Sequence, residues 1–180
     1  MSQTNEILEK IKLYGELSNC ENWIESNIIT SSENKYKLKN LIFPDKSISS
    51  KLLYRMSRNG CTISDFHKLC DNIKNNLIVI QAESNEIFGS YCTWEWDTSG
   101  KDLNENNLGI LFNFSKNSKF CELNLRIHKG CCSDHGPYIY SAFYFKGRMN
   151  ECQIVNNNKI INSNGNIKIK EVEVFKIEEK

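Results

Sequence analysis

The chain has 180 residues, a length that suits one domain with a sizeable core. It carries 23 basic and 22 acidic side chains, and the net charge of +1 disfavours nucleic acid as a partner because phosphate-binding proteins usually have a clear basic excess. There is no apolar run of membrane-spanning length and no signal-peptide pattern at the start, so the eight cysteines indicate reduced thiols in a cytoplasmic protein without membrane insertion.

The first predicted helix covers residues 4–18. Four apolar side chains recur there at near-helical spacing: Ile7, Leu8, Ile11 and Leu17. The apolar face is narrow, so the helix has two interpretations: it packs on its own domain, or it docks on another chain. We expect an N-terminal helical extension over residues 1–24.

Two more helices are expected before the middle of the chain. One covers residues 31–41, where Thr30 and Glu33 have the spacing of a capping box and Pro44 ends the helix. The other begins at a second capping box, Thr62 and Asp65. Four of its apolar side chains share one helical face and are expected in the core: Phe66, Leu69, Cys70 and Ile73.

The rest of the chain has the alternating and β-branched pattern of strands. Strands are predicted at residues 51–56, 77–80, 87–96, 110–114, 123–127, 138–145 and 167–177, separated by turns rich in Asn, Gly and Ser. Helices followed by many short strands predict an α+β fold, in which a two-layer antiparallel β-sandwich is flanked by a few helices.

Six segments of the sequence, in order, resemble the TLDc domain family as it occurs in protists. They are residues 51–60 with 64–72, residues 77–80 with 87–91, residues 94–100, residues 111–114, residues 172–177, and the short segment 26–29 at the start. The resemblance covers about residues 26–177. It predicts a TLDc domain over residues 25–180.

The resemblance also implies a function. Family members are associated with resistance to oxidative stress, and several bind the vacuolar proton-pumping ATPase, without an established catalytic machinery or cofactor. We therefore expect a non-catalytic protein-interaction module whose partners include vacuolar ATPase subunits. One departure concerns Gly136-Pro137, because the glycine-rich stretch that usually follows in the family is replaced by the apolar run 138–145.

One cluster of residues has the composition of a zinc site. His128, Cys131, Cys132 and His135 are ligand types that bind zinc tetrahedrally. Adjacent cysteines chelate poorly, however, because consecutive side chains in an extended segment point to opposite faces. The favoured interpretation is a loop with reduced thiols and no metal.

The same loop offers a redox alternative. An exposed thiol of low pKa at Cys131 or Cys132 is able to oxidise to sulfenic acid, which makes these two residues candidates for peroxide sensing or scavenging. A cysteine nucleophile with His135 as its base lacks any recognisable signature, so an enzyme is not expected. A DNA-associated regulatory factor is the remaining alternative, disfavoured by the net charge.

Overall fold

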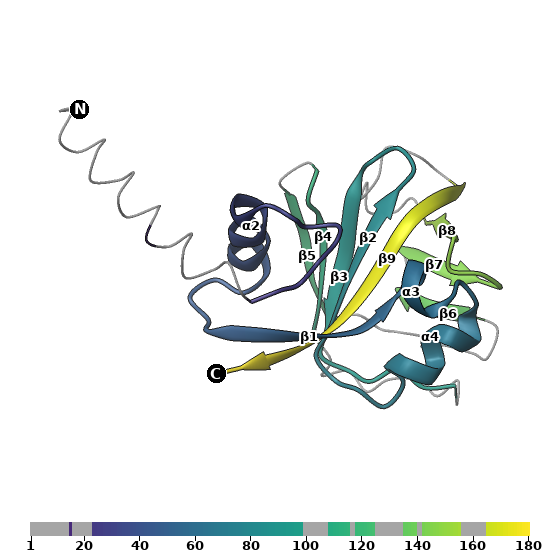
Figure 1. The fold of residues 1–180 in the computed structure, drawn as a ribbon, viewed down its shortest axis with the longest axis horizontal. Coiled ribbons are helices and arrows are strands. Elements are labelled where there is room, and N and C mark those ends of the chain that lie inside the picture. Colours follow the sequence, from purple (N-terminus) through teal and green to yellow (C-terminus); the bar gives the residue numbers. More distant parts are fainter. Residues whose placement is uncertain are drawn as a thin grey trace.

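A computed structural model describes residues 15, 23–98, 108–115, 118–124, 135–139, 142–155 and 165–180 (Figure 1). Its helices are α2 (Ser32–Ile42), α3 (Met56–Asn59) and α4 (Ile63–Cys70). Its strands are β1 (Ile48–Arg55), β2 (Asn76–Ala82), β3 (Ile87–Cys92), β4 (Leu108–Asn113), β5 (Ser118–Asn124), β6 (His135–Ile139), β7 (Phe143–Lys146), β8 (Glu151–Ile154) and β9 (Gly165–Glu179).

The described strands form one antiparallel sheet in the order β5-β4-β3-β2-β9-β8-β7-β6, with β1 pairing to β9. The 15-residue strand β9 is its axis: the first part pairs with β8, and the later part lies between β1 and β2. The predicted α+β class and the antiparallel pairing are confirmed. The division of the strands into two layers stays a prediction, because the hydrogen bonds join them into a single sheet.

The central strands are buried on both faces, as β2 illustrates. Ile78 and Ile80 point into one hydrophobic cluster, which also contains Phe66 of α4. Leu77 and Val79 point the other way, into a second cluster with α2. This explains the uninterrupted apolar run in β2, since a strand covered on both sides needs no polar face.

The sheet must curve around the first cluster. The ring of Phe88 in β3 lies 5.5 Å from the ring of Phe143 in β7. In the order of the sheet these strands are four steps apart, and neighbouring strands are separated by about 4.8 Å, so the two rings would not meet in a flat sheet. Curvature along β9 therefore brings the strands β6–β8 back over the core.

The second predicted helix is confirmed, but its predicted cap is wrong. Ser31 is the N-cap, and its hydroxyl accepts a hydrogen bond from the backbone N–H of Asn34 at 3.2 Å. The predicted capping box of Thr30 and Glu33 does not form. The N-cap lies one residue later than predicted, and the hydrogen bond that its side chain accepts comes from Asn34. The helix ends at Ile42, two residues before Pro44.

The next predicted helix, α4, has the expected capping box: Thr62 Oγ1 accepts from the Asp65 backbone, and the Asp65 carboxylate accepts from the Thr62 backbone. Phe66 and Cys70 are buried as expected. Ile73 was wrongly assigned to this helix, which ends at Cys70. The buried face of α4 is completed instead by Ile63 and His67.

Strand boundaries differ from prediction where burial continues beyond a strand. β3 stops at Cys92, yet Trp94 and Trp96 are buried in the same cluster as Phe88. The apolar run 138–145 is predicted as one strand but contributes to two, β6 and β7, which pair antiparallel. The strand predicted at 110–114 is β4, in which Ile110, Leu111, Phe112 and Asn113 are all buried.

Other differences are simpler. The predicted strand at 51–56 is β1, which ends at Arg55 where α3 begins. Strand β8 was not predicted, because its four residues are too short to show a clear period. Residues 125–127 of one predicted strand, and the predicted helix at 4–18 apart from Gly15, lie outside the described residues.

A buried carboxylate and its neighbours as candidate functional site

The segment of residues 23–29 runs across the sheet just before α2 and forms part of the core. Trp23, Ile24, Ile28 and Ile29 are all buried in the second hydrophobic cluster. The indole Nε1 of Trp23 donates to the backbone oxygen of Lys35 at 3.0 Å, which fixes the segment to α2. We call residues 23–29 the leading segment.

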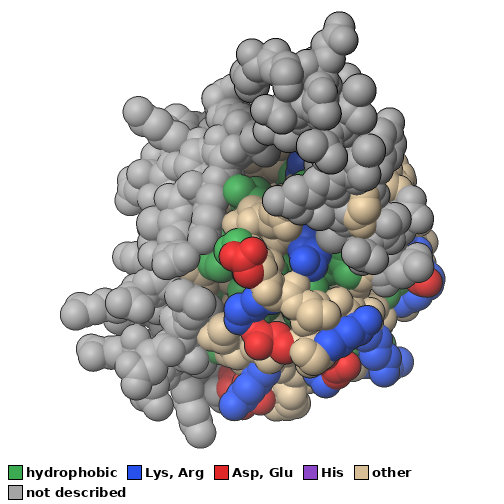
Figure 2. Space-filling model, turned by 90° about the vertical axis from the view of Figure 1, so that its left-hand side faces the viewer, with side chains coloured by type: hydrophobic (Ala, Val, Ile, Leu, Met, Phe, Trp, Pro, Cys, Tyr) green, Lys and Arg blue, Asp and Glu red, His purple; other side chains and the backbone are tan. Residues whose placement is uncertain are grey.

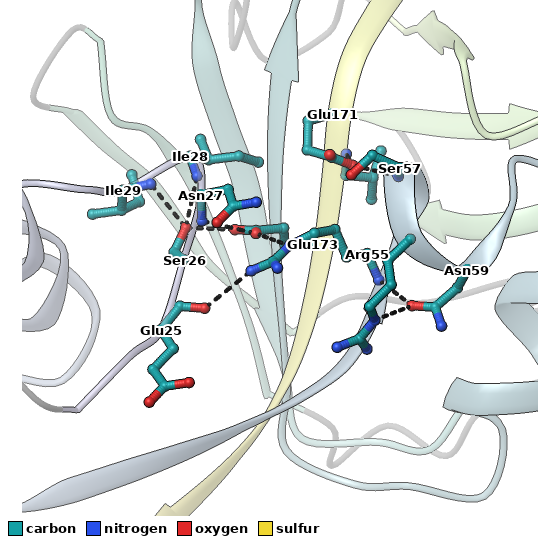
Figure 3. Close-up of polar contacts among 12 residues, drawn as sticks. Glu25, Ser26, Asn27, Ile28, Ile29, Arg55, Ser57, Asn59, Glu171 and Glu173 are labelled. Atoms are coloured by element: carbon teal, nitrogen blue, oxygen red, sulfur yellow. Dashed lines mark hydrogen bonds and ion pairs between the residues drawn. The ribbon is translucent and has the colours of Figure 1, made fainter.

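Glu173 of β9 lies under the leading segment and is completely buried. Its carboxylate accepts three hydrogen bonds (Figure 3): from the Ser26 hydroxyl at 2.5 Å, from the Asn27 backbone N–H at 2.9 Å and from Arg55 Nε at 2.6 Å. The guanidinium of Arg55, itself largely buried, supplies the opposite charge. A buried carboxylate is tolerated only with such compensation.

Ser26 has no free hydrogen-bonding capacity for chemistry. Its hydroxyl donates to Glu173 and accepts from the backbone N–H groups of Ile28 at 3.0 Å and Ile29 at 2.8 Å. A serine nucleophile needs an oxygen lone pair directed at a substrate, and here both lone pairs are engaged by the turn. The Ser26–Glu173 pair therefore acts as a structural clamp.

The clamp extends along β9 to a second carboxylate. Nη2 of the Arg55 guanidinium donates to the backbone oxygen of Glu25 at 3.3 Å. The backbone N–H of Arg55 donates to Asn59 Oδ1 at 2.9 Å. Two residues from Glu173, the Glu171 carboxylate accepts from the Ser57 backbone N–H at 3.1 Å (Figure 3). Together the two glutamates of β9 hold the leading segment and the corner between β1 and α3.

A second polar group contains a histidine and a carboxylate. His67 Nδ1 lies 2.7 Å from Asp71 Oδ1, and Nε2 lies 2.9 Å from the backbone oxygen of His135. A general base needs an imidazole nitrogen open to substrate, but both ring nitrogens here face acceptors within the protein. The pair fastens α4 to β6 and offers no catalytic geometry.

Of the predicted cysteine and histidine cluster, the structure describes one member. His135 begins β6, where its ring lies 5.9 Å from the ring of Tyr144. His128, Cys131 and Cys132 lie outside the described residues. Within the parts of the chain that are described, no three His, Cys, Asp or Glu side chains are grouped as a metal site. The zinc and redox interpretations of this loop stay predictions.

The described cysteines include three that are inert by environment. Burial raises the pKa of the Cys70, Cys92 and Cys152 thiols well above its ordinary value, so they remain protonated at neutral pH. Cys61 is half-buried. The sequence-based interpretation of Cys70 as a core residue is confirmed.

A shallow hollow lies on the outer side of the last strands. It is lined by Lys146 of β7, Glu151 and Gln153 of β8 and Asn166 of β9, all of them exposed. Glu151 forms an ion pair with Lys168, which lowers the pKa of the Glu151 carboxyl group. The Tyr144 hydroxyl donates to Gln153 Oε1.

Sequence reasoning recognised the segments that contain the clamp but not the clamp itself. Glu171 and Glu173 alternate with Val172 and Val174 in the final strand, and Arg55 ends β1. Acidic residues alternating with buried apolar ones are the signal that a paired carboxylate is present. The partner across the fold could not be identified, because Ser26 and Glu173 are 147 positions apart.

The face of the molecule on the side of α2 and the C-terminal end of β9 carries charges of both signs. Figure 2 shows basic and acidic side chains interspersed over its described part. Ion pairs join Lys37 to Glu33 in α2, and Lys46 to Glu179 near the C-terminus. Such mixed, exposed pairs each contribute little to stability. None of the described helices has the length and apolar character needed to cross a membrane.

Comparison with known protein families gives a match over most of the chain. The sequence profile of the TLDc domain matches residues 23–178, which include the leading segment, the clamp and nearly all of β9. No curated protein sequence matches the chain. The TLDc family is one generally without a known catalytic activity. Because the match covers most of the chain and begins at the first buried residue of the leading segment, the chain belongs to the TLDc domain family.

Proposed function

We propose that the protein is a cytoplasmic, non-catalytic protein-interaction module that contributes to resistance to oxidative stress, with subunits of the vacuolar ATPase as its partners. The observation that supports this best is the saturation of the clamp. The serine, the arginine and the carboxylate that most resemble an active site satisfy one another and hold two ends of the domain together. Such a domain is suited to presenting a rigid surface to a partner.

Direct binding tests the proposal. The purified protein, immobilised at one end, is exposed to purified peripheral-sector subunits of the vacuolar ATPase, and association is followed by biolayer interferometry. Saturable binding supports the proposal. If no subunit binds, the ATPase is not the partner. If, in addition, cross-linking captures no protein from cell lysate, the protein is not an interaction module.

Redox sensing through Cys131 or Cys132 is a second proposed function. It is favoured by the burial of Cys70, Cys92 and Cys152, because their protonated thiols do not compete for peroxide. The test is treatment with dilute peroxide followed by peptide mass spectrometry. Selective oxidation of Cys131 or Cys132 supports the proposal, whereas equal, slow oxidation of all cysteines contradicts it.

A further inference from the structure

The hollow over β7, β8 and β9 has a charge pattern that selects a class of partner. Glu151 provides the negative charge of this surface, and the Lys168 ammonium is bonded to it. Arg148 also acts electrostatically on Glu151 and is exposed beside β7. Among the described residues, the basic side chains Lys146, Arg148 and Lys168 and the acidic side chain Glu151 together carry a net charge of +2.

The neutral groups of the hollow are hydrogen-bond donors as well. Gln153 uses its amide oxygen to accept from the Tyr144 hydroxyl, so its NH₂ group is the part available to a ligand. Asn166 is exposed at the register position opposite Gln153 in the β8–β9 ladder. The Lys146 ammonium and the two side-chain amides are therefore hydrogen-bond donors on one surface. A carboxylate, which only accepts hydrogen bonds, would pair with them.

The backbone beneath these residues is regular. Lys146, Gln153 and Asn166 are presented by three adjacent antiparallel strands, joined by the β7–β8 and β8–β9 ladders. Beneath them, Phe145, Cys152 and Ile154 are buried in the first hydrophobic cluster. The hollow thus has a fixed base, and binding in it would cost little backbone ordering.

We propose that this hollow is the docking site for an acidic segment of a partner protein, with a Glu or Asp carboxylate held by Lys146 and the amides of Gln153 and Asn166. The proposal rests on the proposed interaction function and specifies its surface. Charge complementarity carries it: a carboxylate meets donors and a net positive charge, whereas a basic side chain would meet Glu151 only after displacing Lys168.

The first experiment uses hexaglutamate as the probe at low ionic strength, with ¹H–¹⁵N NMR spectra of the whole chain as the readout. We expect shift changes at Lys146, Glu151, Gln153 and Asn166, and we expect that Lys146→Glu weakens hexaglutamate binding about tenfold because one attraction becomes a repulsion. Lys74→Glu is the matched control, since Lys74 is an exposed lysine before β2. It should change the dissociation constant by less than about twofold.

Three results would overturn the proposal: shift changes located elsewhere, equal weakening by both variants, or equal shift changes with hexalysine. A protein partner separates this proposal from the broader one. If the partner binds the Lys146→Glu variant as tightly as the natural chain, the hollow is not the docking site although the interaction function stands. If hexaglutamate binds as expected and no protein partner exists, the interaction function fails and the acidic-ligand site remains.

Discussion

Glu173 combines full burial with a carboxylate that has Arg55, Ser26 and the Asn27 backbone as partners. Removing one partner of a buried ion pair leaves the other uncompensated in a medium of low polarity. We expect Arg55→Met to lower the free energy of unfolding by about 3–5 kcal/mol. Urea denaturation followed by tryptophan fluorescence measures this change.

The control for the clamp is a double-mutant cycle. Combining Arg55→Met with Glu173→Gln removes both charges, so the double variant should be more stable than the sum of the single effects predicts. Glu25→Gln, at an exposed residue beside the clamp, should change stability by less than about 0.5 kcal/mol. Strict additivity of the two clamp substitutions would show that the ion pair is not a coupled unit.

The buried thiols allow a second prediction at this scale. Because burial raises the pKa of Cys70, Cys92 and Cys152, the reactive thiolate is scarce in the folded protein. We expect iodoacetamide at neutral pH to modify these residues at least about a hundredfold more slowly in the native protein than in urea. Mass spectrometry of timed digests gives the rates, and native rates close to those in urea would contradict the assigned burial.

At the scale of elements, Gly89 in β3 is the position where a side chain is excluded most clearly. A Cβ added there would lie 1.9 Å from the backbone oxygen of Ile78 and 2.8 Å from Phe112 Cζ. A backbone oxygen in a sheet ladder cannot move away, so Gly89→Ala should destabilise the protein by about 3 kcal/mol or more. Differential scanning calorimetry measures the effect.

Gly147 provides the comparison. Its φ of +75° suits asparagine, and nothing lies within 4 Å of an added Cβ. Gly147→Asn should cost less than about 1 kcal/mol. If Gly89→Ala destabilised the protein as little as Gly147→Asn, β2 and β3 would have to separate locally. The close approach of Gly89 to the backbone oxygen of Ile78 would then be wrong.

Helices and strands were predictable from the sequence where local signals were strong. They were less predictable where tertiary contacts determine the boundaries and the pairing. The capping box of Thr62 and Asp65 located the start of α4 because its bonds are formed within one turn. The apolar run 138–145 concealed a hairpin, since apolar residues occur in both strands and residues 140–142 include no glycine or proline. The clamp combines residues from opposite ends of the sequence, and no local pattern specifies that pairing.

At the scale of the whole molecule, we expect the leading segment to be required for the folded domain. The predicted division between residues 24 and 25 is untested as a domain boundary, but Trp23 and Ile24 are buried against the sheet. Each fully buried apolar side chain contributes about 1.5–3 kcal/mol, so loss of four of them approaches the whole stability of a domain.

We therefore expect removal of residues 1–29 to unfold the protein and removal of residues 1–22 to leave it folded. Circular dichroism and the dispersion of ¹H–¹⁵N spectra distinguish the two outcomes. A folded chain beginning at Thr30 would show that the leading segment is dispensable. An unfolded chain beginning at Trp23 would show that the domain needs residues before it.

The position of β9 also has a consequence for how the protein is made. Residues 165–179 leave the ribosome after all the other described strands, yet they lie between β1 and β2 and carry Glu173. Until they emerge, β1 lacks its strand partner, and the apolar run of β2 has only β3 beside it. The sheet therefore cannot be completed until β9 has been synthesised, and before then the chain exposes the strand edges and apolar surface that chaperones bind.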